Sequence, residues 1–226
     1  DLDFKSPYQD NLEEFLTVNY INQGTDNLFT NAGNGDGNMN NIERVDVIFS
    51  DGIATASPDN AGFAILDRGN NNGHDAFRIA AILSLDASGD PDLFGDVKTC
   101  TAGNGSNNGD WGHPSTANGN LTIAGYVLRK EQSESRPRVS TALNQQLGGV
   151  FFSFDDLGVD AYQEIYGYAL LAPDGATDPS SAQLLDIDNS AVYPTNTSEP
   201  AGGGLDLIAL TATFASGPLF QGIDTR

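Results

Sequence analysis

The fold that the sequence predicts is decided by residues 64–86, AILDRGNNNGHDAFRIAAILSLD. An apolar run up to Leu66 precedes a loop of glycine and asparagine at residues 67–75, and a second apolar run follows at residues 76–85. A helix is the alternative for the second run, but turn-forming residues on both sides leave it only about ten residues. We therefore expect two strands that pair as a long hairpin around the loop. The second strand should bury one face, made of Phe77, Ile79, Ala81 and Leu83.

Strand-like segments recur along the rest of the chain. Residues 42–49, IERVDVIF, alternate Val45, Val47 and Phe49 with polar residues, which predicts an antiparallel strand with one buried face. Further segments rich in β-branched and aromatic residues are 15–21, 121–130, 150–154, 165–172 and 205–214. With turn signals between them and no sustained helical period, the pattern predicts an all-β fold. We expect a single antiparallel β-sandwich or jelly-roll-like domain over residues 1–226, with long Asn/Gly/Asp-rich loops.

Charge and composition narrow the classes of function. The 226 residues include 31 Asp and Glu against 10 Lys and Arg, a formal net charge of −21. Such a chain repels nucleic-acid phosphates and anionic lipid surfaces, so we expect no nucleic-acid binding. No apolar run approaches the length of a membrane span, so we expect no membrane insertion. Cys100 is the single cysteine, which rules out a disulfide within the chain.

Three loops carry carboxylate and amide oxygens at short spacing, which is the ligand chemistry of Ca²⁺. The alternative is that Asn, Asp and Gly tolerate left-handed turns and cap their own backbone. The first loop resembles the start of a calcium loop but departs from an EF-hand, because Met39 replaces the turn glycine. The predicted calcium ligands are Asn34, Asp36 and Asn38 in the first loop, Asp67, Asn71 and Asp75 in the second, and Asp110 in the third, where Asn104, Ser106 and Asn108 alternate before it.

Catalytic chemistry finds little support in the sequence. His74 and His113 are the only histidines, so a catalytic triad or a zinc site would have to use one of them. Two histidines and a lone cysteine form no recognisable zinc spacing. A loop hydrogen bond is the simpler interpretation of His74. Paired carboxylates of a glycoside hydrolase stay open as an alternative, because their separation is set in space. We predict no catalytic residue.

Trp111 is the only tryptophan and lies in the loop segment GDWGHP. Its indole is a candidate ligand-binding platform that would stack on a sugar face, which makes a carbohydrate-binding module the second functional hypothesis. The alternative is that the indole anchors a long loop onto the sheet.

Several stretches together are similar to a known family: EEFLTVNYI, IERVDVIFSDGI, GHDAFRIAAILSLD, YVLRKE, QLGGVFFSFDDLGVDAYQEIYGYALLAPD and YPTNTSEPAGGGLDLIAL. In this order they resemble an extracellular domain of large secreted, adhesin-like surface proteins of Bacteroidota-type bacteria, exported by the type IX system. The resemblance implies an extracellular or cell-surface location and a structural or adhesive role. We expect the protein to associate with itself, or to bind other surface proteins or glycans. The resemblance assigns no catalytic or binding residue.

Overall fold

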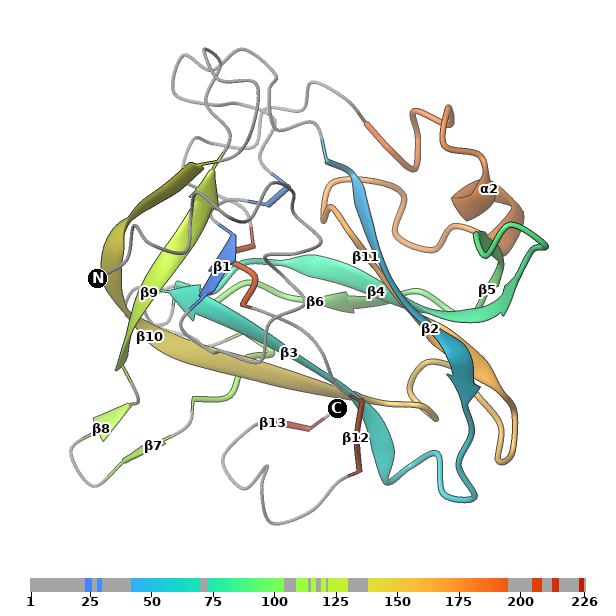
Figure 1. Cartoon of the computed structure of the whole chain (residues 1–226), viewed down its shortest axis with the longest axis horizontal. Helices are drawn as coiled ribbons and strands as arrows, with labels where there is room; N and C mark the ends of the chain where they lie inside the picture. The colour runs from blue at the N-terminus through green and yellow to red at the C-terminus, as the bar shows by residue number, and fades with distance from the viewer. Residues whose placement is uncertain are drawn as a thin grey trace.

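The computed structural model describes residues 23–25, 28–29, 42–69, 73–103, 109–113, 115–116, 119–120, 122–129, 138–194, 205–208, 213–215 and 224–225. The predicted strand at 15–21 lies outside these residues. The described part consists mostly of antiparallel β-sheet, with α2 (Ser181–Leu185) as a single short helix within it. The prediction of an all-β, sandwich-like fold is therefore confirmed (Figure 1).

The first sheet is centred on β10, which is sixteen residues long. One part of β10 pairs with β9 and the other with β3, both in antiparallel fashion. The short strands β1 and β13 add parallel pairs at β9 and β10. The strands of this sheet are β1 (Gln23–Thr25), β9 (Thr122–Arg129), β10 (Arg138–Ser153), β3 (Ala61–Gly69), β12 (Thr213–Ala215) and β13 (Asp224–Thr225).

The second sheet is antiparallel throughout and is centred on β11 and β4. Its strands are β2 (Arg44–Ile53), β11 (Ile165–Leu171), β4 (Phe77–Leu85), β5 (Pro91–Phe94) and β6 (Lys98–Cys100). A separate small hairpin joins β7 (Ser115–Thr116) to β8 (Gly119–Asn120).

Aromatic side chains fill the space between the two large sheets. Phe63 of β3 lies 4.4 Å, between ring centroids, from Tyr168 of β11. Phe77 of β4 makes an edge contact with Phe152 of β10 at 5.9 Å. Ile79 and Ala81 belong to the same buried cluster, and Leu83 packs against it, so the predicted inward face of β4 is confirmed. Val45, Val47 and Phe49 of β2 also pack against this core, as their alternation predicts.

The predicted hairpin between β3 and β4 is wrong. β3 pairs with β10 and β12, whereas β4 pairs with β11, β5 and β6 in the other sheet. β3 thus belongs to the first sheet and β4 to the second. Apolar residues alternate with a period of two in any strand that buries one face. The alternation is the same when the next strand in sequence pairs beside it and when that strand lies in the facing sheet.

A third layer covers the outer face of the second sheet. Ala80 and Ile82 of β4 are buried against Leu184 of α2 and against Val192 and Tyr193 beyond it. The segment that contains α2, Val192 and Tyr193 is mostly polar in sequence, yet its few apolar residues are the ones that cover the sheet. Figure 1 shows α2 beside β5, and Ser181 accepts a hydrogen bond from the backbone of Phe94 through its hydroxyl at 2.8 Å.

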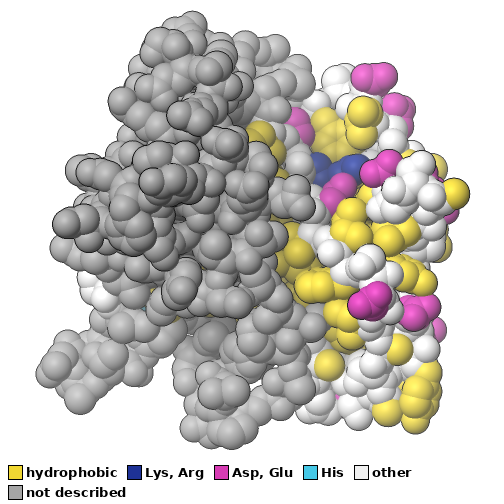
Figure 2. Space-filling model, in the orientation of Figure 1, with side chains coloured by type: hydrophobic (Ala, Val, Ile, Leu, Met, Phe, Trp, Pro, Cys, Tyr) yellow, Lys and Arg dark blue, Asp and Glu magenta, His cyan; other side chains and the backbone are white. Residues whose placement is uncertain are grey.

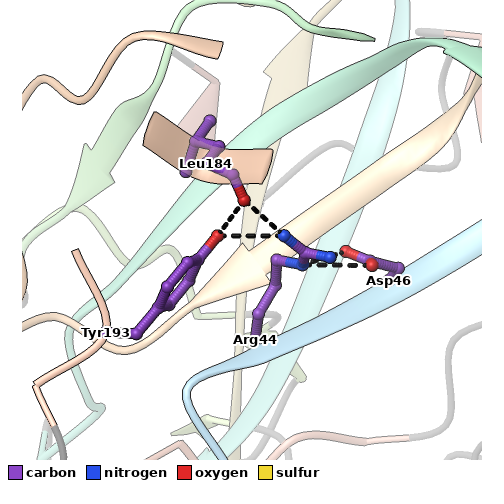
Figure 3. Close-up of polar contacts among 4 residues, drawn as sticks. All are labelled: Arg44, Asp46, Leu184 and Tyr193. Carbon is purple, nitrogen blue, oxygen red and sulfur yellow. Dashed lines mark hydrogen bonds and ion pairs between the residues drawn. The ribbon is translucent and has the colours of Figure 1, made fainter. Parts of the chain in front are cut away.

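Arg44 of β2 fastens this third layer to the sheet (Figure 3). Its guanidinium donates to the carbonyl of Leu184 at 2.6 Å and to the hydroxyl of Tyr193 at 2.9 Å. The Tyr193 hydroxyl in turn donates to the same Leu184 carbonyl at 2.5 Å. Asp46, two residues along β2, forms an ion pair with Arg44 at 3.0 Å. The polar face predicted for β2 is thus half-buried under α2.

Arg78 of β4 is fully buried and performs a similar task. Its guanidinium donates to three backbone carbonyls, those of Ala172 at 2.7 Å, of Ala176, and of Val192 at 3.4 Å. A planar guanidinium has several fixed donors and therefore suits such a multiple contact. Arg78 therefore ties the third layer to the middle of the second sheet.

Candidate functional site

The two histidines and the only tryptophan meet at one end of the sandwich, although 39 residues separate His74 from His113 in the numbering of the chain. The ring centroids of His74 and His113 are 4.8 Å apart, and those of His74 and Trp111 are 5.3 Å apart. Asp67 completes the group, because its carboxylate lies 2.8 Å from Nδ1 of His74. We call Asp67, His74, Trp111 and His113 the histidine cluster.

Asp67 lies in strand β3 of the first sheet and not in the loop that follows it. β3 continues to Gly69, which pairs with Gln146 of β10, so the expectation that Asp67 lies in the loop is wrong. The side chain is fully buried. One carboxylate oxygen accepts the backbone N–H of Asp206 at 2.7 Å, and the other contacts His74. Asp67 thus joins three segments of the chain that are distant in sequence.

His74 is packed from several sides and is 1% exposed. Its ring lies against the backbone of Gly148 in β10, where a Cβ atom would be 2.5 Å from ring atom Cε1. Its carbonyl accepts the backbone N–H of Gly103 at 2.8 Å. Gly148 of β10 pairs with Asp67 of β3, so the His74 ring packs over this pair of residues. Only a residue without a side chain leaves room for the imidazole there.

The segment with Trp111 and His113 is attached to the same strand. Gly112 and Gly149 exchange two backbone hydrogen bonds of 2.9 Å each. The Trp111 indole N–H donates to the carbonyl of Asp75 at 3.1 Å, and its ring packs against Phe77 at 5.6 Å. Trp111 is 1% exposed, so the loop-anchor interpretation accounts for its geometry, whereas stacking on a sugar requires an exposed ring face.

Burial shifts the pKa values of the Asp67 and His74 pair in opposite directions. It raises the pKa of the Asp67 carboxyl to about 7, against the lowering effect of the backbone N–H of Asp206 and the charge of Arg68. It lowers the pKa of His74 to about 4, and the charge of Asp206 opposes this shift. Burial also lowers the pKa of His113; the proximity of His74 acts in the same direction, and the hydrogen bond with the backbone of Leu147 opposes both. Both imidazoles are therefore neutral near pH 7.

Among the described residues, Nε2 of His74 is buried without a hydrogen-bond partner. Both ring nitrogens of His113 are buried too, and this imidazole makes one hydrogen bond with the backbone of Leu147. A buried polar atom without a partner costs about 1–3 kcal/mol, so such atoms are rare unless a ligand or an ion completes them. No hydroxyl or thiol of a described residue is hydrogen-bonded to Nε2 of His74. The arrangement therefore lacks the nucleophile–histidine contact of a triad in this part of the chain.

The predicted calcium ligands are not brought together among the residues that the structure covers. Asn34, Asp36, Asn38, Asn71, Asn104, Ser106 and Asn108 lie outside the described residues. Asp110 is buried, and its carboxylate accepts the backbone N–H of Thr101 at 2.8 Å. Within the described ranges, no group of three or more His, Cys, Asp and Glu side chains is arranged to hold a metal ion. Calcium binding by the three loops stays a prediction.

Sequence reasoning identified each member of the cluster but did not foresee the meeting of the two histidines. The usable signal was compositional, because both histidines and the one tryptophan occur in glycine-rich loops. Their contact depends on the Gly112–Gly149 bridge, which no local pattern encodes.

None of the described helices is long and apolar enough to cross a membrane. No protein-family model, no curated protein and no solved structure matches the chain.

Proposed function

We propose that the chain is a non-enzymatic structural or adhesive module of the bacterial cell surface, and a subunit of a filament, layer or adhesin. The resemblance to type IX-exported surface proteins motivates the location. One structural observation carries the non-enzymatic part: the best candidate for acid–base chemistry, the Asp67–His74 pair, is fully buried in both side chains. A catalytic group has to reach its substrate, whereas this pair joins β3 to the neighbouring segments.

The distribution of charge supports an extracellular, cation-rich setting. Among Lys and Arg side chains that the structure describes, Arg68 and Arg78 are buried, Arg44 is largely covered by the third layer, and Lys98 is partly buried. Acidic side chains recur over the described surface in Figure 2, whereas Lys and Arg form one small patch flanked by acids. The Lys and Arg side chains that the structure describes are thus used mainly inside the fold, whereas acidic side chains lie on its described surface.

Such an exterior favours contacts that divalent cations bridge, because like-charged faces repel each other unless the charge is neutralised. We include calcium in the proposal as the cation that promotes self-association or adhesion. Exposed hydrophobic side chains supply contact area once this repulsion is removed. The large exposed ones among the described residues are Ile48, Leu93, Tyr162, Leu185 and Ile187.

Light scattering after size-exclusion chromatography, with negative-stain imaging of the same fractions, tests the proposal. The protein is compared in millimolar CaCl₂, in EDTA, and in NaCl at the ionic strength of the calcium sample. We expect higher-order species in calcium that NaCl does not reproduce. A strictly monomeric protein in all three conditions, up to high concentration, would contradict the self-assembling form of the proposal. Binding on a glycan array by that monomer would favour the carbohydrate-binding alternative.

A further inference from the structure

We propose that His74 and His113 together bind one divalent transition-metal ion of the Zn²⁺ class, at the end of the sandwich where β3, β10 and residues 109–113 meet. This inference does not depend on the proposed function. It concerns imidazole nitrogens and is distinct from the calcium prediction, which concerns carboxylate and amide oxygens on loops.

The separation of the two rings fits ligation of one ion. A Zn–N bond is about 2.1 Å long, and the ring centre lies about 1.1 Å behind the nitrogen. For N–Zn–N angles of about 90–110°, the centres of two ligating imidazoles are then about 4.5–5.3 Å apart. The observed separation of 4.8 Å, with an angle of 44° between the ring planes, lies in this range.

Two imidazole rings that merely pack against each other reach the same separation. The buried ring nitrogens without a partner are therefore the observation that points to a ligand. His74 is buried, and its Nδ1 contacts Asp67, which leaves Nε2 as a buried nitrogen without a partner. Both nitrogens of His113 are buried as well, and the hydrogen bond with the backbone of Leu147 uses one of them, which leaves the other for a ligand. Two adjacent imidazoles that each keep one buried nitrogen without a partner among the described residues are expected to be completed by an ion.

Asp67 supplies the orienting contact that metal-binding histidines require. A ligating histidine usually donates its other N–H to a carboxylate or a backbone carbonyl, which fixes the tautomer and directs the free nitrogen at the metal. With Nδ1–H donated to Asp67, Nε2 of His74 carries the lone pair. Asp67 is therefore a positioning residue and not a ligand, since its oxygens are used by His74 and by the backbone of Asp206.

The donor type selects the class of ion. Neutral imidazole nitrogen suits Zn²⁺, Cu²⁺ and Ni²⁺, whereas Ca²⁺ and Mg²⁺ prefer oxygen. Burial keeps both imidazoles in the neutral form that binds metals. The bound ion would join the segment of His74 to residues 109–113 and stiffen this end of the sandwich.

Calorimetric titration of ZnCl₂ into tag-free, metal-stripped protein tests the site, with millimolar CaCl₂ present to occupy oxygen sites. We expect one Zn²⁺ per chain. His113→Gln should weaken the affinity by about tenfold or more, because it removes one of two protein ligands. The matched control is Asp75→Asn, which alters a neighbouring loop carboxylate and should bind Zn²⁺ like the wild type. Circular dichroism checks that both variants keep the β-sheet spectrum.

NMR of the two imidazoles in the wild type provides a readout that does not depend on a variant folding. We expect Zn²⁺ to shift the ring nitrogen resonances of both histidines in parallel, with one end point. The proposal is overturned if Zn²⁺ does not bind, if His113→Gln binds as tightly as the wild type, if Asp75→Asn loses binding to the same extent, or if only one ring responds.

Discussion

Gly148 of β10 lies directly beneath the imidazole of His74, so close that a Cβ atom would be 2.5 Å from Cε1 and 2.6 Å from Nε2 of the ring. Gly148 also pairs with Asp67 on β3, which contacts the same ring. The glycine and the Asp67–His74 pair therefore form one packing unit, and a change in one member should be felt by the others.

Gly148→Ala should destabilise the protein by about 1–3 kcal/mol, because the added methyl group has to displace a buried ring in a close-packed region. The free energy of unfolding, measured by urea denaturation, checks this. In a double-mutant cycle with His74→Ala, we expect most of the cost of the methyl group to disappear, since the ring that it meets is gone. Fully additive effects of the two changes would show that the clash is not with His74.

Variants of the Asp67–His74 pair should have opposite pH dependence of stability in metal-free buffer. Asp67→Asn leaves a buried histidine whose folded pKa, about 4, is below its unfolded value of 6.5. The unfolded chain then binds the proton more readily, so stability is lost as the pH falls from about 6.5 towards 4. His74→Gln leaves a carboxyl whose folded pKa, about 7, is above its unfolded value of 3.8, so stability is lost as the pH rises from 3.8 towards 7.

Each slope is at most about 1.4 kcal/mol per pH unit for one proton. In the wild type the two contributions oppose each other over this range, so the pair itself adds little pH dependence. Urea unfolding of each variant and the wild type at pH 4.5, 5.5 and 6.5 measures the slopes, and subtraction of the wild-type values removes the effect of the other carboxylates. Slopes of the same sign in both variants would contradict the opposite shifts.

Arg78→Met should destabilise the protein by about 3 kcal/mol or more. It leaves the buried carbonyls of Ala172 and Val192 and the partly buried carbonyl of Ala176 without this donor, and each buried unpaired acceptor costs about 1–3 kcal/mol. Arg78→Lys should recover only part of this loss, because an ammonium cannot reproduce the planar set of donors. Lys98→Met, on the neighbouring β6, is the control and should change stability by less than about 1 kcal/mol. Equal losses in Arg78→Met and Lys98→Met would argue against the clamp.

Tyr193→Phe should loosen the third layer by about 1–2 kcal/mol, because it removes the hydroxyl that Arg44 and Leu184 share. Hydrogen exchange should accelerate over residues 181–193 more than in β10, since the affected contacts hold this layer to the second sheet. Tyr162→Phe is the matched control at a ring that is 78% exposed, and its unfolding free energy should stay within about 0.5 kcal/mol of the wild type. Equally faster exchange in residues 181–193 and in β10 would show that the Tyr193 hydroxyl does not stabilise the third layer in particular.

Calcium should raise the melting temperature beyond the effect of ionic strength alone. An ion that binds only the folded state stabilises it by mass action, whereas NaCl merely screens the net charge of −21. Thermal melts in CaCl₂, in EDTA, and in NaCl of matched ionic strength separate these effects. The same melts of Asp36→Asn and Asp75→Asn show whether the first or the second predicted loop binds the ion, because the variant of the binding loop loses the stabilisation by calcium. Identical curves in EDTA and in calcium would remove all three loops from consideration.

The sequence alone determined where most strands lie and which faces they bury. The alternating residues of β4 point into the core, and those of β2 pack against it, because an inward face needs only a period of two within one segment. The glycine- and asparagine-rich stretches marked the ends of strands for an equally local reason, the left-handed turns that these residues tolerate. The acidity of the exterior likewise follows from composition.

Tertiary structure alone decided which strands pair and which side chains meet. β3 and β4 adjoin in sequence but lie in different sheets, since a strand's alternation does not specify its hydrogen-bonding neighbour. Arg78 alternates with the inward residues of β4, yet it is buried, because α2 and the residues beyond it cover the outer face of the sheet. His74 reaches His113 only because Gly112 pairs with Gly149 and Gly148 leaves room for the ring. These contacts are long-range, and a pattern within a short segment carries no information about them.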